Sequence, residues 1–517
     1  MNLRKRFISA FLSLCMVISL ASVAVSAQEE EEISYATSEY ITFSNPDDDN
    51  IGEIVEDLYE AKMTVISGLE SLQRKIDVRG MGVTRDNVQD FYMSILFDNP
   101  QFFYVFTYLK YGYAGDEVFY IYPHYITSEK NPGEDTDEEI AQQNIEIGKM
   151  QEAFDKNTQQ LLSGVDESMT DEEKLLAIHD ALVCHVSYSK NSPGKYEKSI
   201  YTAYGGIVEG TGVCQSYALA YEYLVRLAGI QDIHIVSNTI HSWNMVKLDG
   251  NWYHIDATFD DPVSDVNGRV LHKYFLISDK KLSENDSSES HGTWTPNYSA
   301  ESTKYDSGDY YWLDTESQVI FDGGKIYYVD MSSNTSAGSK MGIITQIDES
   351  GKKTQLAKTE DLWSAGTGFY AGNYTRLFKE GDYLYFNNST TVMRVNVNDY
   401  KQEVVYTLPD DIKESNCIYG LKKGDNTIYI GYGKTPTSVM TIVEYKYDFN
   451  SGTAPKYEMG DVNHDNILSI ADVTAVQSYI AGNSVEIDIS LADMDKDSLI
   501  TIGDCTAIQK IIAGMAA

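Results

Sequence analysis

The stretch Gly210-Thr-Gly-Val-Cys214-Gln-Ser-Tyr-Ala-Leu-Ala places a cysteine between a glycine-rich approach and a helix-forming run that continues to Gly229. This pattern predicts a helix that begins at Cys214 and ends at the glycine. At a helix start, unpaired backbone N–H groups and the helix dipole favour the thiolate, which is the nucleophilic form of cysteine. Cys214 is therefore a candidate nucleophile, and the alternative is a cysteine that only packs.

Further along the chain the sequence predicts a β-hairpin. Residues 242–248 and 251–257 are strand-like, and the Asp-Gly pair between them is typical of a type I′ turn. A two-residue turn fixes the register of the two strands, and here it places Asp256 opposite Trp243. The diagonal neighbour of Asp256 on the same face is His241, at a separation that long side chains bridge.

His241 and Asp256 thus form a candidate imidazole–carboxylate pair. A carboxylate beside an imidazole fixes its tautomer and stabilises the imidazolium, which suits a general base. His254 lies on the same face opposite Met245 and is the competing histidine. We favour His241, because it stands where the strand begins and a thiol on a neighbouring loop can approach it.

Three motifs together resemble the transglutaminase-like superfamily of papain-like folds. They are G-x-V-C-Q-x-Y-A around Cys214, H-S-W-N-x-V from His241, and W-Y-H-I-D-A-T-F-D-D-P, which contains Asp256. The resemblance covers about residues 170–280, and with a helical lead about 140–280. It implies that Cys214 is the nucleophile, His241 the general base and Asp256 its orienting group, with no cofactor for catalysis.

The oxyanion partner in this superfamily is usually the backbone N–H of the cysteine together with an upstream side chain. Tyr201 and Tyr204 are the candidates here. The motifs also contain positions that the resemblance assigns to packing rather than chemistry, namely Trp243, Asn244, Trp252 and Tyr253.

The superfamily contains amide-forming transglutaminases, cysteine proteases, glycoprotein amidases and inactive members. The expected reaction is acyl transfer through a thioester, on a protein or peptide substrate. We favour hydrolysis over crosslinking, because water is abundant and no acceptor-amine site can be recognised. The alternatives are a crosslinking transglutaminase and an inactive binding or structural component. A glycoside hydrolase would need a carboxylate pair, which cannot be identified among so many acidic residues.

A duplicated acidic loop ends the chain. Residues 461–482 and 493–514 align without gaps, and each loop spaces oxygen ligands as a calcium loop does, at positions 1, 3, 5, 7, 9 and 12. The predicted ligands are Asp461, Asn463, Asp465, the carbonyl of Ile467, Ser469 and Asp472 in the first loop, and Asp493, Asp495, Asp497, the carbonyl of Leu499, Thr501 and Asp504 in the second. Two Ca²⁺ ions are therefore expected.

Over about 58 residues this segment resembles a type I dockerin. The resemblance implies that it plugs the protein into a cohesin module of a scaffoldin, as in the cellulosomes that degrade plant polysaccharides. Loop positions 10 and 11 often carry a Ser/Thr pair that selects the cohesin. Here they are Ile470-Ala471 and Ile502-Gly503, which leaves the cohesin class open. Cys505 matches Val473 of the first repeat and is expected to be buried.

The N-terminus has the pattern of a cleaved secretory signal. Basic residues 1–6 precede apolar residues 7–25, and small residues end the segment at Ala27. The expected location is extracellular, in a cell-surface or released complex, with no membrane span after cleavage. The net charge of −38 excludes a basic footprint for nucleic acid and disfavours anionic lipid. The cysteines that remain, Cys184, Cys214, Cys417 and Cys505, form no close pair that indicates a disulfide framework.

Between the two resemblances the pattern changes to short strands and glycine turns. The runs 321–329, 378–386 and 421–430 are alike and weakly resemble the blades of propeller-type repeats. Ahead of the cysteine, helices are predicted at 51–76, 85–99 and 138–162, with strands within 102–126 and a helix that begins with a capping box at Thr170.

The predicted fold class is multidomain α+β. It combines a papain-like, transglutaminase-type α+β catalytic domain, a β-rich accessory domain with propeller-like repeats, and an all-α dockerin of paired EF-hand-like loops. The predicted segments are a signal peptide at 1–27, an acidic flexible lead and N-terminal α/β region at 28–139, the catalytic domain at 140–300, the β-rich domain at 301–450, a linker at 451–457 and the dockerin at 458–517.

Overall fold

The computed structural model describes residues 33–37, 58–189, 199–261, 266–285, 290–359, 361–452, 459–463, 467–485, 487–497 and 499–513. The predicted signal peptide, most of the predicted linker and Asp465 lie outside these residues. Among the described helices, none is long and apolar enough to cross a membrane.

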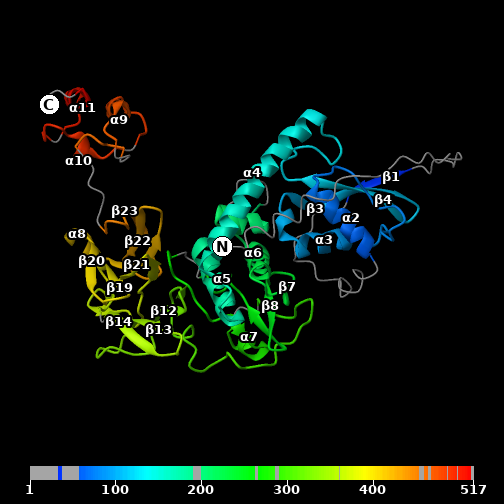
Figure 1. Cartoon of the computed structure of the whole chain (residues 1–517), viewed down its shortest axis with the longest axis horizontal. Coiled ribbons are helices and arrows are strands. Elements are labelled where there is room, and N and C mark those ends of the chain that lie inside the picture. The colour runs from blue at the N-terminus through cyan, green and yellow to red at the C-terminus, as the bar shows by residue number, and fades with distance from the viewer. Residues whose placement is uncertain are drawn as a thin grey trace.

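The N-terminal region is a four-stranded sheet with two helices, coloured blue in Figure 1. Its elements are β1 (Ser34–Thr37), α2 (Tyr59–Glu70), β2 (Ile76–Asp77), α3 (Val88–Asp98), β3 (Val105–Ala114) and β4 (Glu117–Tyr125), and the strand order is β1-β3-β4-β2. Two expectations are corrected. Part of the supposedly flexible lead is a strand that pairs with β3, and the helix predicted to reach Ile76 ends at Glu70.

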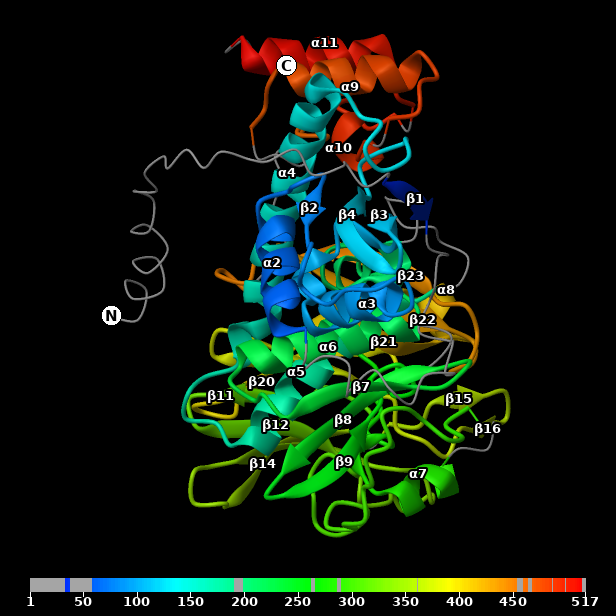
Figure 2. The same cartoon turned by 90° about the vertical axis from the view of Figure 1, so that its right-hand side faces the viewer.

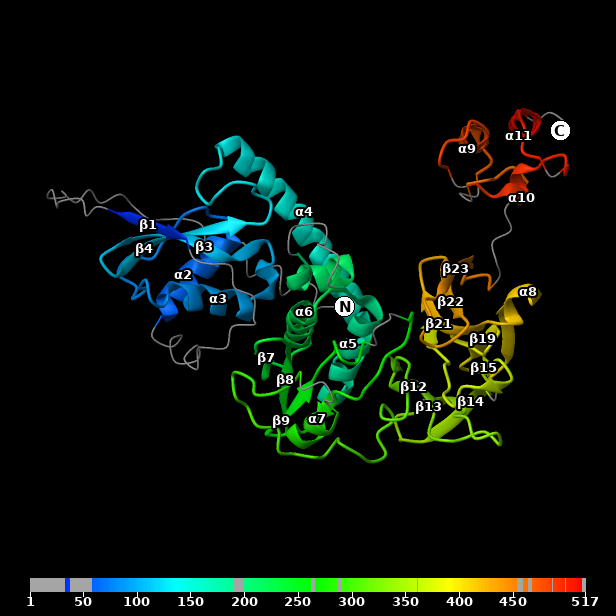
Figure 3. The same ribbon diagram turned by 180° about the vertical axis from the view of Figure 1, so that it is seen from behind.

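The region that the sequence predicts to be catalytic, called the catalytic region below, follows, with the long helix α4 leading into it (Figure 3). Its helices are α4 (Asp137–Leu161), α5 (Asp171–His185), α6 (Cys214–Leu227) and α7 (Asp279–Asn285). Its strands are β5 (Ser187–Tyr188), β6 (Thr211–Gly212), β7 (Ile233–Ser237), β8 (Ser242–Leu248), β9 (Asn251–Ile255) and β10 (Phe275–Ile277). Strands β10-β9-β8-β7 form one antiparallel sheet, on which α6 packs. The capping box predicted at Thr170 opens α5.

One continuous core joins the N-terminal and catalytic regions. It extends from Leu58 and Phe91 through Leu176 and Tyr221 to Phe275. Burial of apolar surface stabilises a fold by about 25 cal/mol per Å², so this shared core fixes the catalytic elements against the N-terminal sheet.

The β-rich region contains three antiparallel sheets that follow one another along the chain. They are β11 (Ile320–Asp322), β12 (Lys325–Asp330), β13 (Gly342–Ile347) and β14 (Lys353–Thr359); β17 (Leu377–Glu380), β18 (Tyr383–Asn387), β19 (Thr391–Asn396) and β20 (Gln402–Thr407); and β21 (Cys417–Lys423), β22 (Thr427–Gly433) and β23 (Thr441–Lys446). A short pair, β15 (Ser364–Ala365) and β16 (Gly368–Phe369), and helix α8 (Asp410–Lys413) accompany them. Each of the three similar runs forms the first hairpin of one sheet.

The catalytic region is interlocked with the β-rich region. The backbone N–H of Leu421 in β21 donates to the carbonyl of Asn267 at 2.8 Å. Gly268 has a φ of +77°, and a side chain there would collide with the Leu421 carbonyl, so this close approach requires glycine. The backbone N–H of Val270 donates to the carbonyl of Glu316 at 3.3 Å, and the fully buried Arg376 donates to the same carbonyl at 2.8 Å. The loop between β9 and β10 is therefore anchored in the β-rich region.

The C-terminal segment holds α9 (Ile470–Ile480), α10 (Ile489–Ala492) and α11 (Ile502–Ile512). Helices α9 and α11 lie side by side in Figure 2 and contact each other. Val473, Val476, Cys505 and Ile508 form their small core, which confirms that Cys505 is a buried residue.

Candidate active site and calcium loops

Cys214 is the first residue of α6, as the sequence predicts. The preceding residue, Val213, has extended backbone geometry, so the helix starts abruptly at the cysteine. A side chain at position 212 would come within 2.5 Å of the Ser216 hydroxyl, which explains the glycine two residues before the thiol. Cys214 itself is half-buried, whereas the next turn of the helix is buried. The thiol therefore stands at the positive end of a rigid helix.

The β8–β9 hairpin has the predicted register. Both turn residues have positive φ, 48° at Asp249 and 81° at Gly250, as a type I′ turn requires. Met245 pairs with His254 across the two strands. His241 directly precedes β8, where its backbone N–H donates to the side-chain oxygen of Asn238 at 2.9 Å. The local signals therefore place His241 and Asp256 at one end of the hairpin.

His241 and Asp256 meet in a buried contact. Nε2 of His241 lies 2.6 Å from Oδ2 of Asp256, and both side chains are almost fully buried. The other carboxylate oxygen of Asp256 accepts the backbone N–H groups of Thr258 at 2.9 Å and Phe259 at 3.1 Å. These two bonds hold Oδ1, and Oδ2 is the oxygen that contacts the imidazole.

The same contact sets the charge on the imidazole. Burial alone would lower the pKa of His241, but the charge and hydrogen bond of Asp256, with a hydrogen bond and charge interaction from Cys214, raise it to about 10. Burial opposes ionisation of Asp256, yet His241 and then His291 lower the pKa of this carboxyl. Since Nε2 of His241 is used by Asp256, Nδ1 is the nitrogen left for the thiol. The pKa of His241 therefore responds to both Cys214 and Asp256.

His254, the competing histidine, is engaged elsewhere. Its Nδ1 accepts the indole N–H of Trp243 at 3.0 Å, and its Nε2 lies 2.8 Å from Oδ1 of Asp279. Burial lowers the pKa of His254 despite this carboxylate. Both ring nitrogens are occupied by the sheet and by α7, so His254 supports the fold and does not face the thiol.

His291 belongs to the site, and the sequence offered no signal for it. Its Nε2 lies 2.7 Å from Oδ2 of Asp256, the same oxygen that contacts His241. The ring stacks on Tyr274, with centroids 5.4 Å apart and 21° between planes. His291 lies in a loop 35 residues beyond Asp256, with no strand or helix periodicity around it.

The structure adds a candidate for the oxyanion partner. Tyr204 is buried against Phe103, with ring centroids 4.8 Å apart, so its ring belongs to the core. Tyr188 is only half-buried and pairs in β5 with Gly212, two residues before the thiol. Burial raises the pKa of Tyr188, and the charge of Cys214 raises it further. Tyr188 is therefore a hydroxyl near the candidate nucleophile.

A second buried cluster contains His179, Asp180 and His272. Nδ1 of His179 and Nε2 of His272 lie 2.9 Å and 3.0 Å from Oδ1 of Asp180. Each buried cluster, His179–Asp180–His272 and His241–Asp256–His291, brings three potential metal-ligand atoms within 4.8 Å of one another. Their short nitrogen–oxygen distances also fit hydrogen-bonded ion pairs, and in both clusters one carboxylate oxygen serves two imidazoles.

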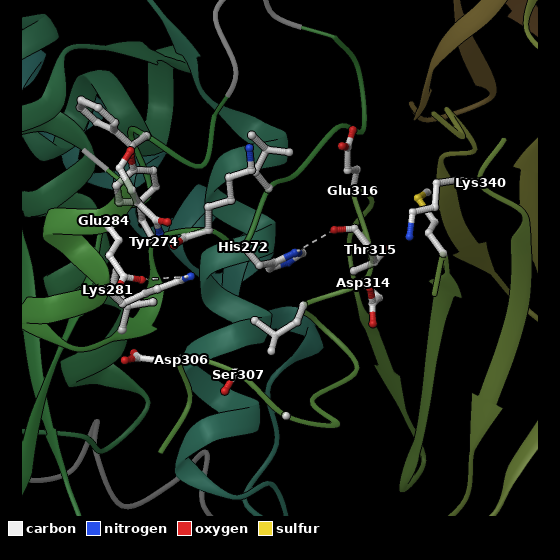
Figure 4. A pocket seen from close by; sticks show the side chains of 18 of the residues that line it. His272, Tyr274, Lys281, Glu284, Asp306, Ser307, Asp314, Thr315, Glu316 and Lys340 are labelled. Atoms are coloured by element: carbon white, nitrogen blue, oxygen red, sulfur yellow. Dashed lines mark hydrogen bonds and ion pairs between the residues drawn. The ribbon is translucent and has the colours of Figure 1, made fainter. Parts of the chain in front are cut away.

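A cleft of about 860 Å³ lies between the catalytic and β-rich regions (Figure 4). His272 reaches across it, with Nδ1 3.4 Å from the carbonyl of Thr315. Phe259 forms part of its wall, and the Phe259 ring contacts the His241 imidazole with centroids 4.9 Å apart. Phe259 therefore contacts both the cleft and the candidate base, His241.

In the first calcium loop, the position-12 carboxylate organises the backbone. Asp472 is fully buried, and its two oxygens accept the N–H groups of Val462 at 3.0 Å and Ser469 at 2.9 Å. Ser469 in turn caps α9. Asp461, at position 1 of the same loop, is also buried. The predicted ligands that the structure describes here are Asp461, Asn463, Ile467, Ser469 and Asp472.

The second loop repeats this arrangement around Asp504 and Thr501, which form the capping box of α11. The carboxylates of Asp493, Asp495 and Asp497 offer ligand atoms within 4.8 Å of one another. Leu499, whose backbone carbonyl is the predicted ligand, follows them in the sequence. Its side chain is exposed.

The charges of this loop fit a divalent cation. A backbone hydrogen bond from Asp497 favours the ionised form of Asp495, but desolvation and the carboxylates of Asp497, Asp504 and Asp493 raise the pKa of Asp495. Such crowding of hard oxygen ligands is what Ca²⁺ neutralises. The donor set therefore fits calcium.

Comparisons with known proteins agree with both resemblances. A family model of the transglutaminase-like superfamily matches residues 159–257, and the type I dockerin domain model matches residues 459–513. Type I dockerins bind calcium, and a dockerin implies binding to a cohesin in an extracellular cellulosome context. No curated protein matches the chain.

Two solved structures show limited similarity. A crystal structure of a TGase is 13% identical with a TM-score of 0.20, over 30% of this chain and 44% of that one. The extracellular domain of a one component system from B. thetaiotaomicron is 15% identical with a TM-score of 0.18, over 40% of this chain and 22% of that one. The chain thus spans less than half of either structure. Residues 159–257 are a transglutaminase-like core domain, and residues 459–513 are a type I dockerin domain.

Proposed function

We propose that the protein is a cysteine-dependent acyl-transfer enzyme of a cellulosome-type complex, and specifically a peptidase. The observation that carries this proposal is the bridging position of His241. Nε2 of its imidazole lies 2.6 Å from Asp256, and a hydrogen bond and charge interaction with Cys214 contribute to its raised pKa. A nucleophile, a base and an orienting carboxylate in this order are the groups that thioester chemistry requires.

The reaction begins when His241 takes the proton of Cys214 and the thiolate attacks the carbonyl carbon of an amide. The C–N bond then breaks as the imidazolium returns the proton to the leaving amine, which leaves an acyl thioester on Cys214. Asp256 stabilises the imidazolium throughout, because its oriented oxygen stays on Nε2. The backbone N–H of Cys214 and a hydroxyl such as Tyr188 or Tyr201 supply hydrogen bonds to the oxyanion.

The second half of the reaction decides the product. In hydrolysis, His241 removes a proton from water, the hydroxide attacks the thioester, and the released thiolate regains a proton. In transamidation, an amine takes the place of water. We favour hydrolysis, and a protein-crosslinking transglutaminase is the second candidate function.

The dockerin would hold this enzyme on a scaffoldin cohesin with two bound Ca²⁺ ions, one in each loop. We further propose that residues 1–27 are a cleaved signal peptide and that the mature protein works outside the cell. Catalysis itself would use no metal or organic cofactor.

A protein substrate supplied with a fluorescent primary amine tests the reaction. The full-length protein and its Cys214→Ala variant are incubated with unfolded casein and dansylcadaverine, and products are analysed by mass spectrometry. New peptide termini that require Cys214 indicate hydrolysis, whereas incorporated amine indicates transamidation. If neither product depends on Cys214 and no acyl adduct forms on it, the protein is an inactive binding component and the proposal fails.

A further inference from the structure

The Asp256 carboxylate has a complete set of hydrogen-bond donors, and His291 is the least expected of them. Oδ1 accepts two backbone N–H groups, from Thr258 and Phe259. Oδ2 lies 2.6 Å from Nε2 of His241 and 2.7 Å from Nε2 of His291. A carboxylate offers about four lone-pair sites, so each of them has a donor. The second imidazole thus occupies the last free site of the oxygen that serves the base.

His291 is fixed by the rings around it. It is 4% exposed, and its ring contacts Phe259 at 4.6 Å and Trp243 at 4.9 Å between centroids, besides its stacking on Tyr274. It also meets His241 edge to face, with centroids 5.0 Å apart and an interplanar angle of 89°. Such a packed ring cannot rotate away from Asp256 without moving several neighbours. The N–H donor therefore has a fixed position.

This arrangement makes His291 act on the base through Asp256. Without its donor, Oδ2 would keep only His241, and the buried site would lose the ring that holds the carboxylate from the opposite side. Rotation of the carboxylate about its Cβ–Cγ bond would then weaken the contact with Nε2 of His241. The thiolate–imidazolium pair would become less stable, since the imidazolium depends on an aligned negative charge.

We propose that His291 is a positioning residue that holds Asp256 aligned on His241, so that the working unit is Cys214–His241–Asp256–His291. This inference rests on the proposed function, because it assigns His291 a role in the same reaction. A positioning role differs from a merely structural role in one measurable respect. A structural residue affects stability, whereas a positioning residue also moves the pH dependence of the thiol's reactivity.

The test is the rate of iodoacetamide labelling of Cys214 against pH in the full-length protein, followed by peptide mass spectrometry. We compare the wild type with His291→Leu, which has no donor, and His291→Gln, which keeps a neutral N–H donor. His254→Gln is the matched control, because His254 is an equally buried histidine that contacts a different carboxylate, Asp279.

We expect His291→Leu to shift the labelling profile to higher pH by about one unit, which is about a tenfold loss of rate on the rising limb. His291→Gln should remain within about threefold of the wild type, and His254→Gln should leave the profile unshifted even where it lowers the melting temperature. If His291→Leu does not fold, His291→Asn serves instead, since its shorter side chain does not reach Oδ2.

A donor-free variant with the wild-type profile would overturn the inference, as would a Gln variant shifted as far as the Leu variant. Failure of the proposed function looks different. In that case wild-type Cys214 itself labels no faster than the half-buried Cys184.

Discussion

Oδ2 of Asp260 lies 3.3 Å from Nε2 of His179, and this buried contact ties the loop that follows β9 to helix α5. The cluster continues through Asp180, whose second oxygen accepts the backbone N–H of Val319 at 2.6 Å. Val319 directly precedes the first strand of the β-rich region. A single group of buried charges therefore joins the loop after β9, helix α5 and the β-rich region.

The first prediction concerns the stability of this junction. Burial opposes the charged form of His179, but Asp180 and Asp260 raise the pKa of this imidazole to about 9. Asp180→Ala would remove the buried carboxylate that His179 and His272 share, and breaking a buried pair of this kind costs about 3–5 kcal/mol of unfolding free energy. Urea denaturation measures this cost. The exposed Asp171→Ala is the control, expected to change stability by less than about 1 kcal/mol. Equal effects for the two variants would show that the buried cluster contributes nothing special.

The second prediction separates the two histidines of the hairpin. His241→Ala removes the group between the thiol and Asp256, so amide-bond turnover should fall by about 10²–10⁴-fold or more. His254→Ala breaks contacts with Trp243 and Asp279 and should mainly lower the melting temperature. Initial rates and thermal unfolding of both variants check this. The reverse pattern would assign the base to His254.

The third prediction is a pH dependence. Because Asp256 raises the pKa of His241 from 6.5 to about 10, the imidazolium persists through neutral pH and is lost only as the pH approaches 10. Asp256→Asn removes this charge, so that only Cys214 still opposes the lowering of the His241 pKa by burial. The alkaline limb of kcat/KM should therefore move to lower pH by several units, with a neutral-pH loss of up to about 10⁴-fold, smaller than that of Cys214→Ala.

The raised pKa of His241 also affects the stability of the fold. The raised pKa of His241 stabilises the fold fully below pH 6.5, and this contribution disappears as the pH rises from there to about 10. In Asp256→Asn it should be absent across that range. An unchanged alkaline limb in the Asn variant would mean that Asp256 does not control the imidazole.

The fourth prediction concerns the dockerin. Without Ca²⁺ the carboxylates of Asp493, Asp495 and Asp497 repel one another, so calcium binding should contribute folding free energy. Chelation, or Asp461→Ala combined with Asp493→Ala, should abolish cohesin binding in a pull-down. Labelling of Cys214 should remain unchanged, because the two units are separate in the chain. Cohesin binding that persists in excess chelator would refute the assignment.

The side chains at position 10 of the two loops are a further feature of the dockerin. Ile470 and Ile502 are each 62% exposed, at positions where many dockerins carry hydroxyl residues. Each isoleucine is the first residue of its helix, α9 or α11.

Local signals explain what could be predicted from the sequence. The helix start at Cys214, the Asp249-Gly250 turn and the capping box at Thr170 each depend on a few neighbouring residues, and all are present in the structure. The hairpin register then places His241 near Asp256 without further information. These are short-range rules of backbone geometry, so one sequence is enough to apply them.

What escaped prediction depends on contacts between distant residues. The strand Ser34–Thr37 is short and polar, and it forms only because β3 offers an edge about seventy residues later. His291 meets Asp256 from an irregular loop, and Asn267 meets Leu421 across two regions of the chain. None of these pairs has a periodic pattern, so tertiary packing alone determines them.

The central claim is that Cys214 is an activated nucleophile, and the fifth prediction tests it most directly. The full-length protein is treated with iodoacetamide at neutral pH, and the labelling rates of Cys184, Cys214, Cys417 and Cys505 are compared by mass spectrometry. Cys417 and Cys505 are buried, so half-buried Cys184 is the informative reference. Cys214 should label at least about tenfold faster than Cys184, and His241→Ala should remove the difference. Equal rates for Cys214 and Cys184 in the wild-type protein would contradict the account.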